Sequence, residues 1–339
     1  GIVKILCLSD FGVRPGDRWF WNSVPENSDE VEFVHTTMQD RYAGWGKLVG
    51  YYPRLLQLGW RAMRQSRNGD YDLITAWEGK AGFPLALLRR LSKQRIPPLA
   101  ILAFSIRGPI KQFPGLARYG ASGADHFCVP TQAERQHYAH QLRLPLERIR
   151  HLPIGIHDLY GGQFGKEPGD FIFSGGRSGR DYATLLHAVK GLTLPVVINA
   201  RPFNLRHLDV PANVRVNNLL PSQQYRDLNW DARIVVVPLH HVYEAVGLTA
   251  ILQGMAAGKA VICTDLPGAA EYVRHGETGL LVPEGDAVAL RKALVYLWEH
   301  PEICRAMGWR GREIFAEQYT FTAFSRRVVT YLHEIGGMV

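Results

Sequence analysis

The 339-residue sequence lacks the features that mark several common classes of protein. It has no apolar run of the length that crosses a membrane, and its start, GIVKILCLSD, is predicted to be a strand and not a signal peptide. Its few cysteines are far apart and show no CxxC spacing: Cys7, Cys128, Cys263 and Cys304. Three of them lie in strand-like apolar runs. We therefore expect buried free thiols in a reducing cytoplasm, not disulfides or metal ligands.

Several chemical motifs are also missing. The thirteen histidines include no HExxH or other metal spacing, and the neighbouring pair His240 and His241 would point in different directions, so we predict no metal site. No GxSxG elbow or cysteine-nucleophile context is present, which leaves covalent hydrolase chemistry without support. No RRM, KH or helix-turn-helix signature is present, which argues against a nucleic-acid partner.

Acidic residues are absent from two long windows, 41–69 and 79–124. Residues 1–156 hold 21 Lys and Arg against 13 Asp and Glu, which accounts for the whole net charge of +8. An acid-free basic surface attracts phosphate, as an anionic membrane, a lipid-phosphate acceptor or nucleic acid offers it. Charge that serves only solubility explains scattered basic residues but poorly explains two such windows.

The segment 53–67, PRLLQLGWRAMRQSR, predicts a basic amphipathic helix within this region. One face is apolar and another cationic: Leu56, Trp60 and Met63 against Arg54, Arg61 and Arg64. Such a helix either lies on a membrane or packs its apolar face on a sheet, and the sequence leaves both readings open.

The chain length and the strand–helix alternation predict two domains. At 339 residues with 46% apolar content, the chain exceeds the size of one hydrophobic core. Strands are expected at 2–8, 31–35, 73–76, 99–104, 126–129, 149–153, 171–174, 196–198, 214–217, 234–237 and 260–263. Helices are expected at 53–67, 83–93, 132–141, 182–189, 222–228, 247–257, 287–299, 301–317 and 322–335. We therefore predict an α/β protein of two Rossmann-like doubly wound domains that face a cleft, joined by a Gly-rich linker at 157–170.

The stretch 236–285 combines a carboxylate with a phosphate-ready helix start. Strand 234–237 is followed by a loop carrying Glu244, which leads through Gly247 into a helix of small residues. The carboxyl ends of parallel strands bind ligands, and the N–H groups of Gly247, Leu248 and Thr249 can receive phosphate. A carboxylate beside a phosphate site would repel the phosphate unless it binds the hydroxyl groups of the same ligand. A sugar diphosphate is a ligand that needs both the carboxylate and the helix start. The alternative is that Glu244 is merely solvated or favours the helix dipole.

Three further segments follow predicted strands. Glu271 either caps a helix that begins near Ala269 or accepts a sugar hydroxyl. The Gly-rich turn in FIFSGGRSGRDY resembles a phosphate cradle with Arg177 and Arg180 as cationic clamps, or is a flexible turn with surface arginines. In the first domain, loops after strands carry residues that can stack on or bind an acceptor, although loop aromatics more often serve packing: Phe11, Gly12, Trp77 and Glu78.

With these residues assembled, the chain resembles a retaining glycosyltransferase of the GT-B architecture, in glycosyltransferase family 4 (glycosyl transferases group 1). Residues 127–157 resemble that family's strand, helix and domain junction, and GGR at 175–177 resembles its phosphate-binding turn. Residues 244–286 resemble its donor-binding core, and 319–335 resemble the terminal helix that crosses back to the first domain. The implied domains are 1–156 for the acceptor, 157–320 for the nucleotide sugar, and the crossing helix 321–339.

The resemblance implies a hexosyltransferase-type transfer from a nucleotide diphosphate sugar, with retention and without metal or cofactor. It assigns Glu244 and Arg177 to catalysis, and it assigns these residues to the nucleotide sugar: Gly176, Arg180, Val246, Gly247, Leu248, Thr249 and Gln253. Three departures stand out. The second glutamate of the family's pair is Gln253 here. Gln253 follows Glu244 by nine positions, which is one more than the usual spacing. The Lys that usually follows Arg177 by a few residues is absent, and Arg180 lies in that region instead.

These observations predict a cytoplasmic enzyme, monomeric or dimeric, that is peripheral at the inner face of a membrane if its basic half binds lipid. The acceptor is expected to be a lipid, a glycan or a small molecule. If the basic first domain binds it, a lipid-linked or anionic acceptor is expected. The alternatives are a nucleotide-sugar epimerase or phosphorylase on the same fold, or a catalytically weak nucleotide-sugar-binding protein.

Overall fold

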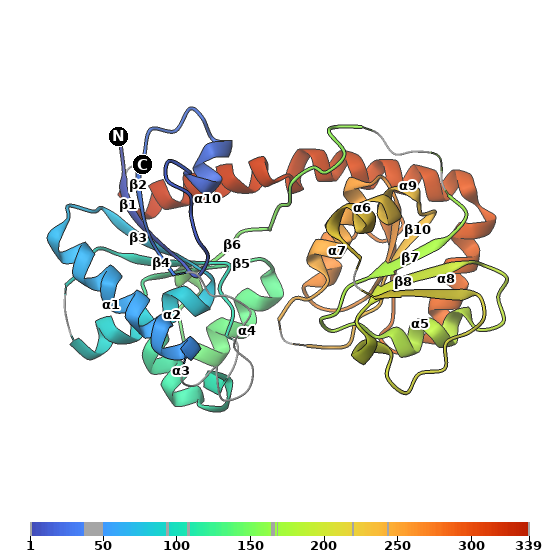
Figure 1. Cartoon of the computed structure of the whole chain (residues 1–339), viewed down its shortest axis with the longest axis horizontal. Coiled ribbons are helices and arrows are strands. Elements are labelled where there is room, and N and C mark those ends of the chain that lie inside the picture. Colours follow the sequence, from blue (N-terminus) through green and yellow to red (C-terminus); the bar gives the residue numbers. More distant parts are fainter. Residues whose placement is uncertain are drawn as a thin grey trace. The chain divides into compact units, whose positions relative to one another are not determined.

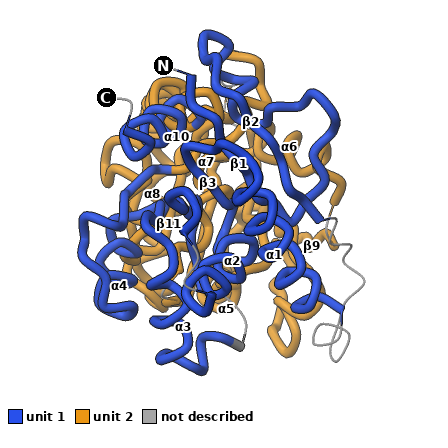
Figure 2. Tube along the Cα trace, turned by 90° about the vertical axis from the view of Figure 1, so that its left-hand side faces the viewer, with its two compact units in different colours: residues 1–153, 325–339 blue, residues 154–324 orange. Residues whose placement is uncertain are grey.

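The computed structural model describes residues 2–36, 50–92, 95–106, 109–163, 167, 169–218, 220–242 and 244–337. The chain divides into two compact units (Figure 2). Unit 1 consists of Gly1–Pro153 together with Ser325–Val339, and unit 2 of Ile154–Phe324. The division falls after Pro153, whereas the sequence placed a boundary after residue 156.

Unit 1 is built on a six-stranded parallel sheet in the order β2-β1-β3-β4-β5-β6. Its strands are β1 Lys4–Ser9, β2 Glu30–His35, β3 Leu73–Trp77, β4 Leu99–Leu102, β5 His126–Val129 and β6 Ile149–His151. One face is covered by α1 Tyr52–Asn68, α2 Glu78–Ser92, α3 Pro114–Ala121 and α4 Gln132–Leu142, and the other by the end of α10 Phe321–Ile335 (Figure 1). The strands β1, β3, β4 and β5 are nearly continuous apolar runs because both faces of the sheet are buried there. The edge strand β2, EVEFVH, alternates instead and is largely accessible.

Unit 2 has a second six-stranded parallel sheet, in the order β12-β11-β10-β7-β8-β9. Its strands are β7 Ile172–Gly175, β8 Val196–Ala200, β9 Val214–Asn218, β10 Ile234–Val237, β11 Ala260–Thr264 and β12 Gly279–Val282. Its helices are α5 Tyr182–Val189, α6 Ser222–Asp231, α7 Leu248–Ala256, α8 Ala287–Glu299 and α9 Pro301–Ile314, which continues as a π-helical turn at Phe315–Tyr319. Alternate residues of β10 and β11 face α5 and α8 on one side and α7 on the other.

The parallel α/β fold predicted from the sequence is confirmed for both units, with local differences. The sequence missed α3 and β12, and it placed the start of α2 at residue 83. In the structure, β3 passes into α2 without a loop, because Glu78 turns the backbone sharply in the left-handed region at φ 60°. Pro84 lies inside this helix, where the sequence pattern indicated its first turn.

The four cysteines are free and buried, as predicted. Cys7, Cys128 and Cys263 lie in strands, and Cys304 lies in α9. Burial raises the pKa of the Cys263 thiol to about 12 and that of Cys304 to about 11. The thiols are therefore held in the protonated form, which is neither nucleophilic nor a good metal ligand.

The end of α10 is attached to unit 1 through a buried carboxylate. His333 Nε2 lies 2.9 Å from both carboxylate oxygens of Asp29, whose side chain is 1% exposed. Trp21 Nε1 also donates to Asp29, at 3.2 Å. Within the described ranges, no helix has the length and apolar character needed to span a bilayer.

Candidate functional site

The loops that follow β7 and β10 meet at the carboxyl edge of the unit 2 sheet. The Asp181 N–H donates to the Pro238 carbonyl at 3.0 Å, and the His240 N–H donates to the Gly179 carbonyl at 2.9 Å. Arg180 and Leu239 lie between these bonds as an isolated antiparallel bridge. The two loops are thus tied together by backbone bonds, at the edge where parallel α/β sheets bind ligands.

Gly247 opens α7 at this edge, as the sequence predicted. Its backbone is left-handed, at φ 81°, and a Cβ there would lie 3.0 Å from both Leu239 Cδ2 and Val237 Cγ1. No side chain of the described residues caps the helix at this position. Val246 lies beside it and contacts the β7 loop, since a Cβ on Gly179 would come within 2.8 Å of Val246 Cγ2. The first N–H groups of α7 therefore start at the joined loops, as an anion site requires.

Arg180 places a positive charge at the ends of the central strands. Its Nε donates to the Gly175 carbonyl at 3.1 Å and its Nη1 to the Ser178 carbonyl at 2.9 Å, so the side chain folds back over its own loop. Burial raises the pKa of Tyr182 and of Cys263, and the charge of Arg180 partly opposes both shifts. The positive charge of Arg180 therefore acts on the first residue of α5 and on the C-terminal part of β11.

Arg177 and Gly176 occupy the turn between β7 and Arg180. The Arg177 side chain is exposed, and its carbonyl accepts a hydrogen bond from Asn204 Nδ2 at 2.8 Å. Gly176 has φ 121°, and a Cβ there would meet the Arg180 guanidinium at 2.4 Å. The Tyr182 hydroxyl donates to the Gly176 carbonyl at 2.6 Å. Sequence reasoning missed Tyr182 and Asn204, which hold the turn, because neither belongs to a recognised motif.

The remaining predicted donor residues lie at the start and along one face of α7. Glu244 is half-buried in the loop before the helix, and Thr249 is exposed in its first turn. Gln253 is half-buried one turn further on, on the same face as Thr249. Thr249 and Gln253 thus lie on the side of α7 that is not packed into the core, and Glu244 lies in the loop that precedes the helix.

Glu271 lies on the next strand connection. It is exposed in the short 3-10 helix Ala269–Tyr272 after β11, and its N–H donates to the Gly268 carbonyl at 3.1 Å. Gly268, at φ 90°, occupies the position before this helix. The N-cap position of this helix is therefore occupied by Gly268 and not by Glu271.

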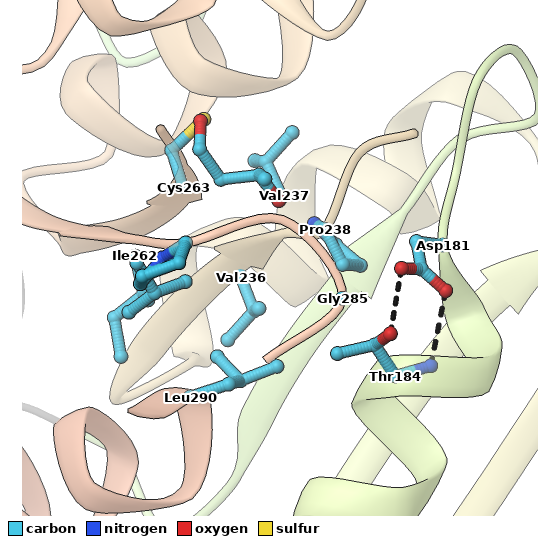
Figure 3. A pocket seen from close by; sticks show the side chains of 12 residues that line it. Asp181, Thr184, Val236, Val237, Pro238, Ile262, Cys263, Gly285 and Leu290 are labelled. Carbon is cyan, nitrogen blue, oxygen red and sulfur yellow. Dashed lines mark hydrogen bonds between the residues drawn. The ribbon is translucent and has the colours of Figure 1, made fainter. Parts of the chain in front are cut away.

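A small pocket lies behind the joined loops, on the α5 and α8 side of the sheet (Figure 3). It is lined by the ends of β10, β11 and β12 together with Asp181 and Thr184. Asp181 caps α5: one carboxylate oxygen accepts from the Thr184 N–H at 3.0 Å and the other from Thr184 Oγ1 at 2.6 Å. The capped α5 fixes the C-terminal end of the loop that carries Arg180.

In unit 1, the candidate acceptor residues meet at the carboxyl ends of β1 and β3. Trp19 makes edge-on contacts with Phe11 and Trp77, at 4.9 and 4.7 Å between ring centroids. Gly12 is exposed in the same loop. The structure therefore joins the two strand ends that sequence reasoning singled out, through Trp19, which it did not single out.

An ion-paired cluster lies beside these rings. Lys80 Nζ is 3.0 Å from carboxylate oxygens of both Asp10 and Glu78. Burial lowers the pKa of Lys80, but the two carboxylates raise it more, and the net shift is upward. The sequence pointed only to Glu78. Lys80 was missed because the residues after β3 were read as a loop, whereas the first turn of α2 brings it back to Asp10.

Comparison with known proteins finds a family match within unit 2. Residues 184–300 match the family model described as Glycosyl transferases group 1. The chain is 32% identical to the D-rhamnosyltransferase WbpZ of Pseudomonas aeruginosa over 143 residues. This aligned stretch covers 40% of this chain and 37% of that protein. The chain is 29% identical over 126 residues to alpha-maltose-1-phosphate synthase of Mycolicibacterium smegmatis, 35% and 32% of the two chains. The chain matches well under half the length of these relatives.

Solved structures agree with the fold over the whole chain. Sucrose-phosphate synthase from Thermosynechococcus elongatus gives a TM-score of 0.75 at 16% identity, covering 99% of this chain and 100% of that one. HepE from Anabaena, in complex with UDP and glucose, gives 0.69 at 16% identity, covering 98% and 100%. The two parallel sheets therefore form the two-domain α/β architecture of GT-B glycosyltransferases, as the sequence predicted.

Proposed function

We propose that this protein is a glycosyltransferase that moves a sugar from a nucleotide diphosphate sugar to an acceptor with retention of configuration. One observation carries the proposal: Gly247 starts an uncapped helix directly against the loop that holds Arg180. A helix start and a guanidinium side by side suit a diphosphate. The glycosyl transferases group 1 domain at 184–300, and neighbours solved with UDP, support the same ligand class.

The donor would be held by backbone and side-chain groups together. The N–H groups of Gly247, Leu248 and Thr249 would receive the diphosphate, and Val246 and Gly176 would shape the approach to it. Arg177, exposed at the mouth of the turn, and Arg180 would balance its charge. This arrangement concentrates positive potential where the leaving diphosphate develops negative charge, so we propose that the reaction needs neither a metal nor a cofactor.

Carboxylate and amide groups beside the helix would orient the sugar and the ribose. Glu244, half-buried before α7, would accept hydroxyl hydrogens of the transferred sugar. Gln253 would contact the ribose diol as a neutral partner, which loses the charge assistance that a second glutamate would give. We therefore propose that catalysis rests mainly on positioning and on stabilisation of the leaving group, by Arg177 in particular.

The acceptor site is proposed at the strand ends of unit 1. Phe11, Trp19 and Trp77 offer ring faces and edges for a sugar ring, and the Asp10–Lys80–Glu78 cluster offers both acceptors and a donor for hydroxyl groups. Gly12 leaves the neighbouring backbone accessible. This combination suits a glycan or glycolipid head group, and Lys80 allows an anionic substituent.

A ligand screen tests the donor assignment. UDP, GDP, ADP and their common sugar conjugates are expected to raise the Tm in a subset of cases, because a ligand that binds only the folded state stabilises it by mass action. Product analysis of the donor that shifts the Tm separates the rivals. A changed sugar epimer would favour an epimerase, phosphate-dependent turnover a phosphorylase, and binding without any product a binding protein. No shift with any nucleotide would reject the proposal.

A further inference from the structure

Three neighbouring helices of unit 1 present apolar side chains to solvent. Helices α1, α2 and α3 lie side by side on one face of the sheet (Figure 1). Gly59 of α1 lets the Pro84–Leu85 backbone of α2 approach closely, and Gly120 of α3 does the same for the Phe83 ring. The outer sides of these helices, together with the residue that precedes α3, carry exposed large apolar residues, which we call the α1–α3 surface: Leu56, Trp60, Leu91, Phe113, Leu116 and Tyr119.

The α1 helix corrects one sequence expectation. Met63 packs into the core with Leu58 and Ala62, whereas Leu56 and Trp60 are exposed. These two residues therefore belong to the outward side of the helix, together with the arginines, and not to the side that packs on the sheet. The alternative that α1 simply buries its apolar stripe accounts for Met63 but leaves Leu56 and Trp60 unexplained.

The α1–α3 surface is also strongly basic. No acidic residue occurs in the described parts of 50–69 and 79–124, and Glu32, which accepts a hydrogen bond from Gln65 at the edge of α1, comes from β2. Two arginines lie over exposed rings: Arg64 is 5.6 Å from the Trp60 ring centroid, and Arg90 is 5.5 Å from that of Tyr119. Further exposed cations on these helices are Arg54, Arg61 and Arg67.

Exposed apolar groups are thus combined with an excess of cations, and the carboxylates that the structure describes nearby are Glu32 at the edge of α1 and Asp125, which pairs with Arg89 of α2. This combination fits one kind of partner. Nucleic acid would use the cations, and its bases could stack on Trp60, but it offers no place for Leu56, Leu91 and Leu116. The interface of an anionic bilayer accepts both, with leucine and indole side chains at the acyl boundary and guanidinium groups among the phosphates. Tryptophan in particular prefers that interface.

We propose that unit 1 docks on an anionic lipid membrane through the α1–α3 surface. Leu56, Trp60 and Leu116 would enter the head-group region, and Arg64, Arg67 and Arg90 would contact lipid phosphates. The proposal goes beyond sugar transfer and does not depend on it, because the surface belongs to unit 1 and contains none of the proposed donor or acceptor residues.

The test is flotation of the full chain with vesicles of phosphatidylcholine, alone or mixed with phosphatidylglycerol. The chain is expected to float with the anionic vesicles only, and added salt should release it. Trp60→Ser should weaken binding about tenfold through loss of the interfacial indole. The control is Trp309→Ser in unit 2, because Trp309 is 47% exposed and Trp60 is 49% exposed. Trp309→Ser should leave vesicle binding unchanged.

A second variant pair tests the charges. Replacing Arg64 and Arg67 by Ser should lower the affinity roughly fivefold for each charge removed, while Arg215→Ser, at an exposed position on β9, should not lower it. Absent binding, binding that ignores lipid charge or salt, or equal losses in test and control variants would overturn the proposal. Capture of a single-stranded oligodeoxythymidine without vesicle binding would also overturn it, in favour of nucleic acid. No donor is present in these assays, so their outcome is separate from that of the ligand screen.

Discussion

Gly247 meets two constraints at once, a left-handed backbone and a site with no space for a side chain. Its φ is 81°, and a Cβ would crowd Leu239 and Val237 at 3.0 Å. Gly276 has a similar φ of 78°, but no atom of the residues that the structure describes lies within 4 Å of an added Cβ. Substituting each of the two glycines therefore distinguishes the free energy lost to left-handed backbone strain from the free energy lost to steric crowding.

Gly247→Ala is expected to lower the free energy of unfolding by about 2–4 kcal/mol, since the left-handed strain and overpacking add. Gly276→Ala should cost about 1–2 kcal/mol, from strain alone. Urea titration gives both values. Only the first variant should also weaken binding of the nucleotide found by Tm screening. Equal costs and unchanged nucleotide affinity in both variants would refute the role of Gly247 at the helix start.

The two arginines of the β7 loop are expected to respond differently to replacement. Arg177 is exposed, so Arg177→Ala should lower turnover about 10²–10³-fold while leaving the Tm nearly unchanged. Glu244→Ala should behave in the same way. Arg180→Ala should lower both turnover and Tm, because it removes hydrogen bonds to Gly175 and Ser178. Steady-state rates and melting curves of the three variants check this, and full activity of Arg177→Ala would remove it from the site.

The sequence was sufficient for residues whose type is dictated by the backbone, and insufficient for side-chain direction. Gly247 and the anion-ready helix follow from a strand, a glycine and a small-residue helix. The inward fold of Arg180 does not follow, because it depends on which carbonyls the loop leaves open. The pairing of Lys80 with Asp10 joins residues 70 positions apart, which no local pattern encodes.

At the scale of elements, glycine residues explain why helix α3 was not predicted from the sequence. Helix α3 contains Gly115 and Gly120 and is followed by Gly123, which local propensity reads as a turn. In the structure, Gly120 admits the Phe83 ring, and an added Cβ on Gly123 would lie 1.9 Å from the Ala86 carbonyl. These glycines serve close packing on α2, so tertiary contact overrides propensity. Strand β12 was not predicted because its sequence, GLLV, is only four residues long and directly follows a turn.

Helix α9 is linked to the segment after β6 by an ion pair whose effect depends on pH. Arg312, almost fully buried, donates from Nη2 to Asp158 at 2.6 Å. Burial raises the pKa of Asp158, but the hydrogen bonds from Arg312, Tyr160 and Gly162 lower it more, so the folded-state pKa lies below the unfolded value. The stabilisation is therefore present above the unfolded pKa of about 3.9 and is lost as the pH falls through the folded pKa.

Asp158→Asn is expected to lower the free energy of unfolding by about 3–5 kcal/mol at neutral pH, because it leaves the Arg312 charge without its counter-ion. The variant should also show a weaker loss of stability between neutral and acid pH than the parent chain. Urea titrations across that range measure both effects. Glu277→Gln is the control, since Glu277 pairs with exposed Arg274 and Arg310 and should matter little. Parallel pH profiles for Asp158→Asn and the parent would contradict the assignment.

At the scale of the whole molecule, the chain starts and ends in the same compact unit. Unit 1 combines Gly1–Pro153 with Ser325–Val339, so α10 begins in unit 2 and finishes in unit 1. Each of two helices buries a leucine in its own unit: Leu332 of α10 in unit 1 and Leu297 of α8 in unit 2 are both 0% exposed. One leucine from each helix can therefore report on the stability of its own unit.

Leu332→Ala and Leu297→Ala should each cost about 2–5 kcal/mol, through lost transfer energy and a residual cavity. Hydrogen exchange resolves where that loss acts. Leu332→Ala should speed exchange of the β1 and β5 amides and leave β10 and β11 protected, although it lies near the end of the chain. Leu297→Ala should do the reverse. If both variants speed exchange equally in all four strands, the two units unfold as one. If Leu332→Ala changes nothing beyond α10, that helix is not part of the core of unit 1.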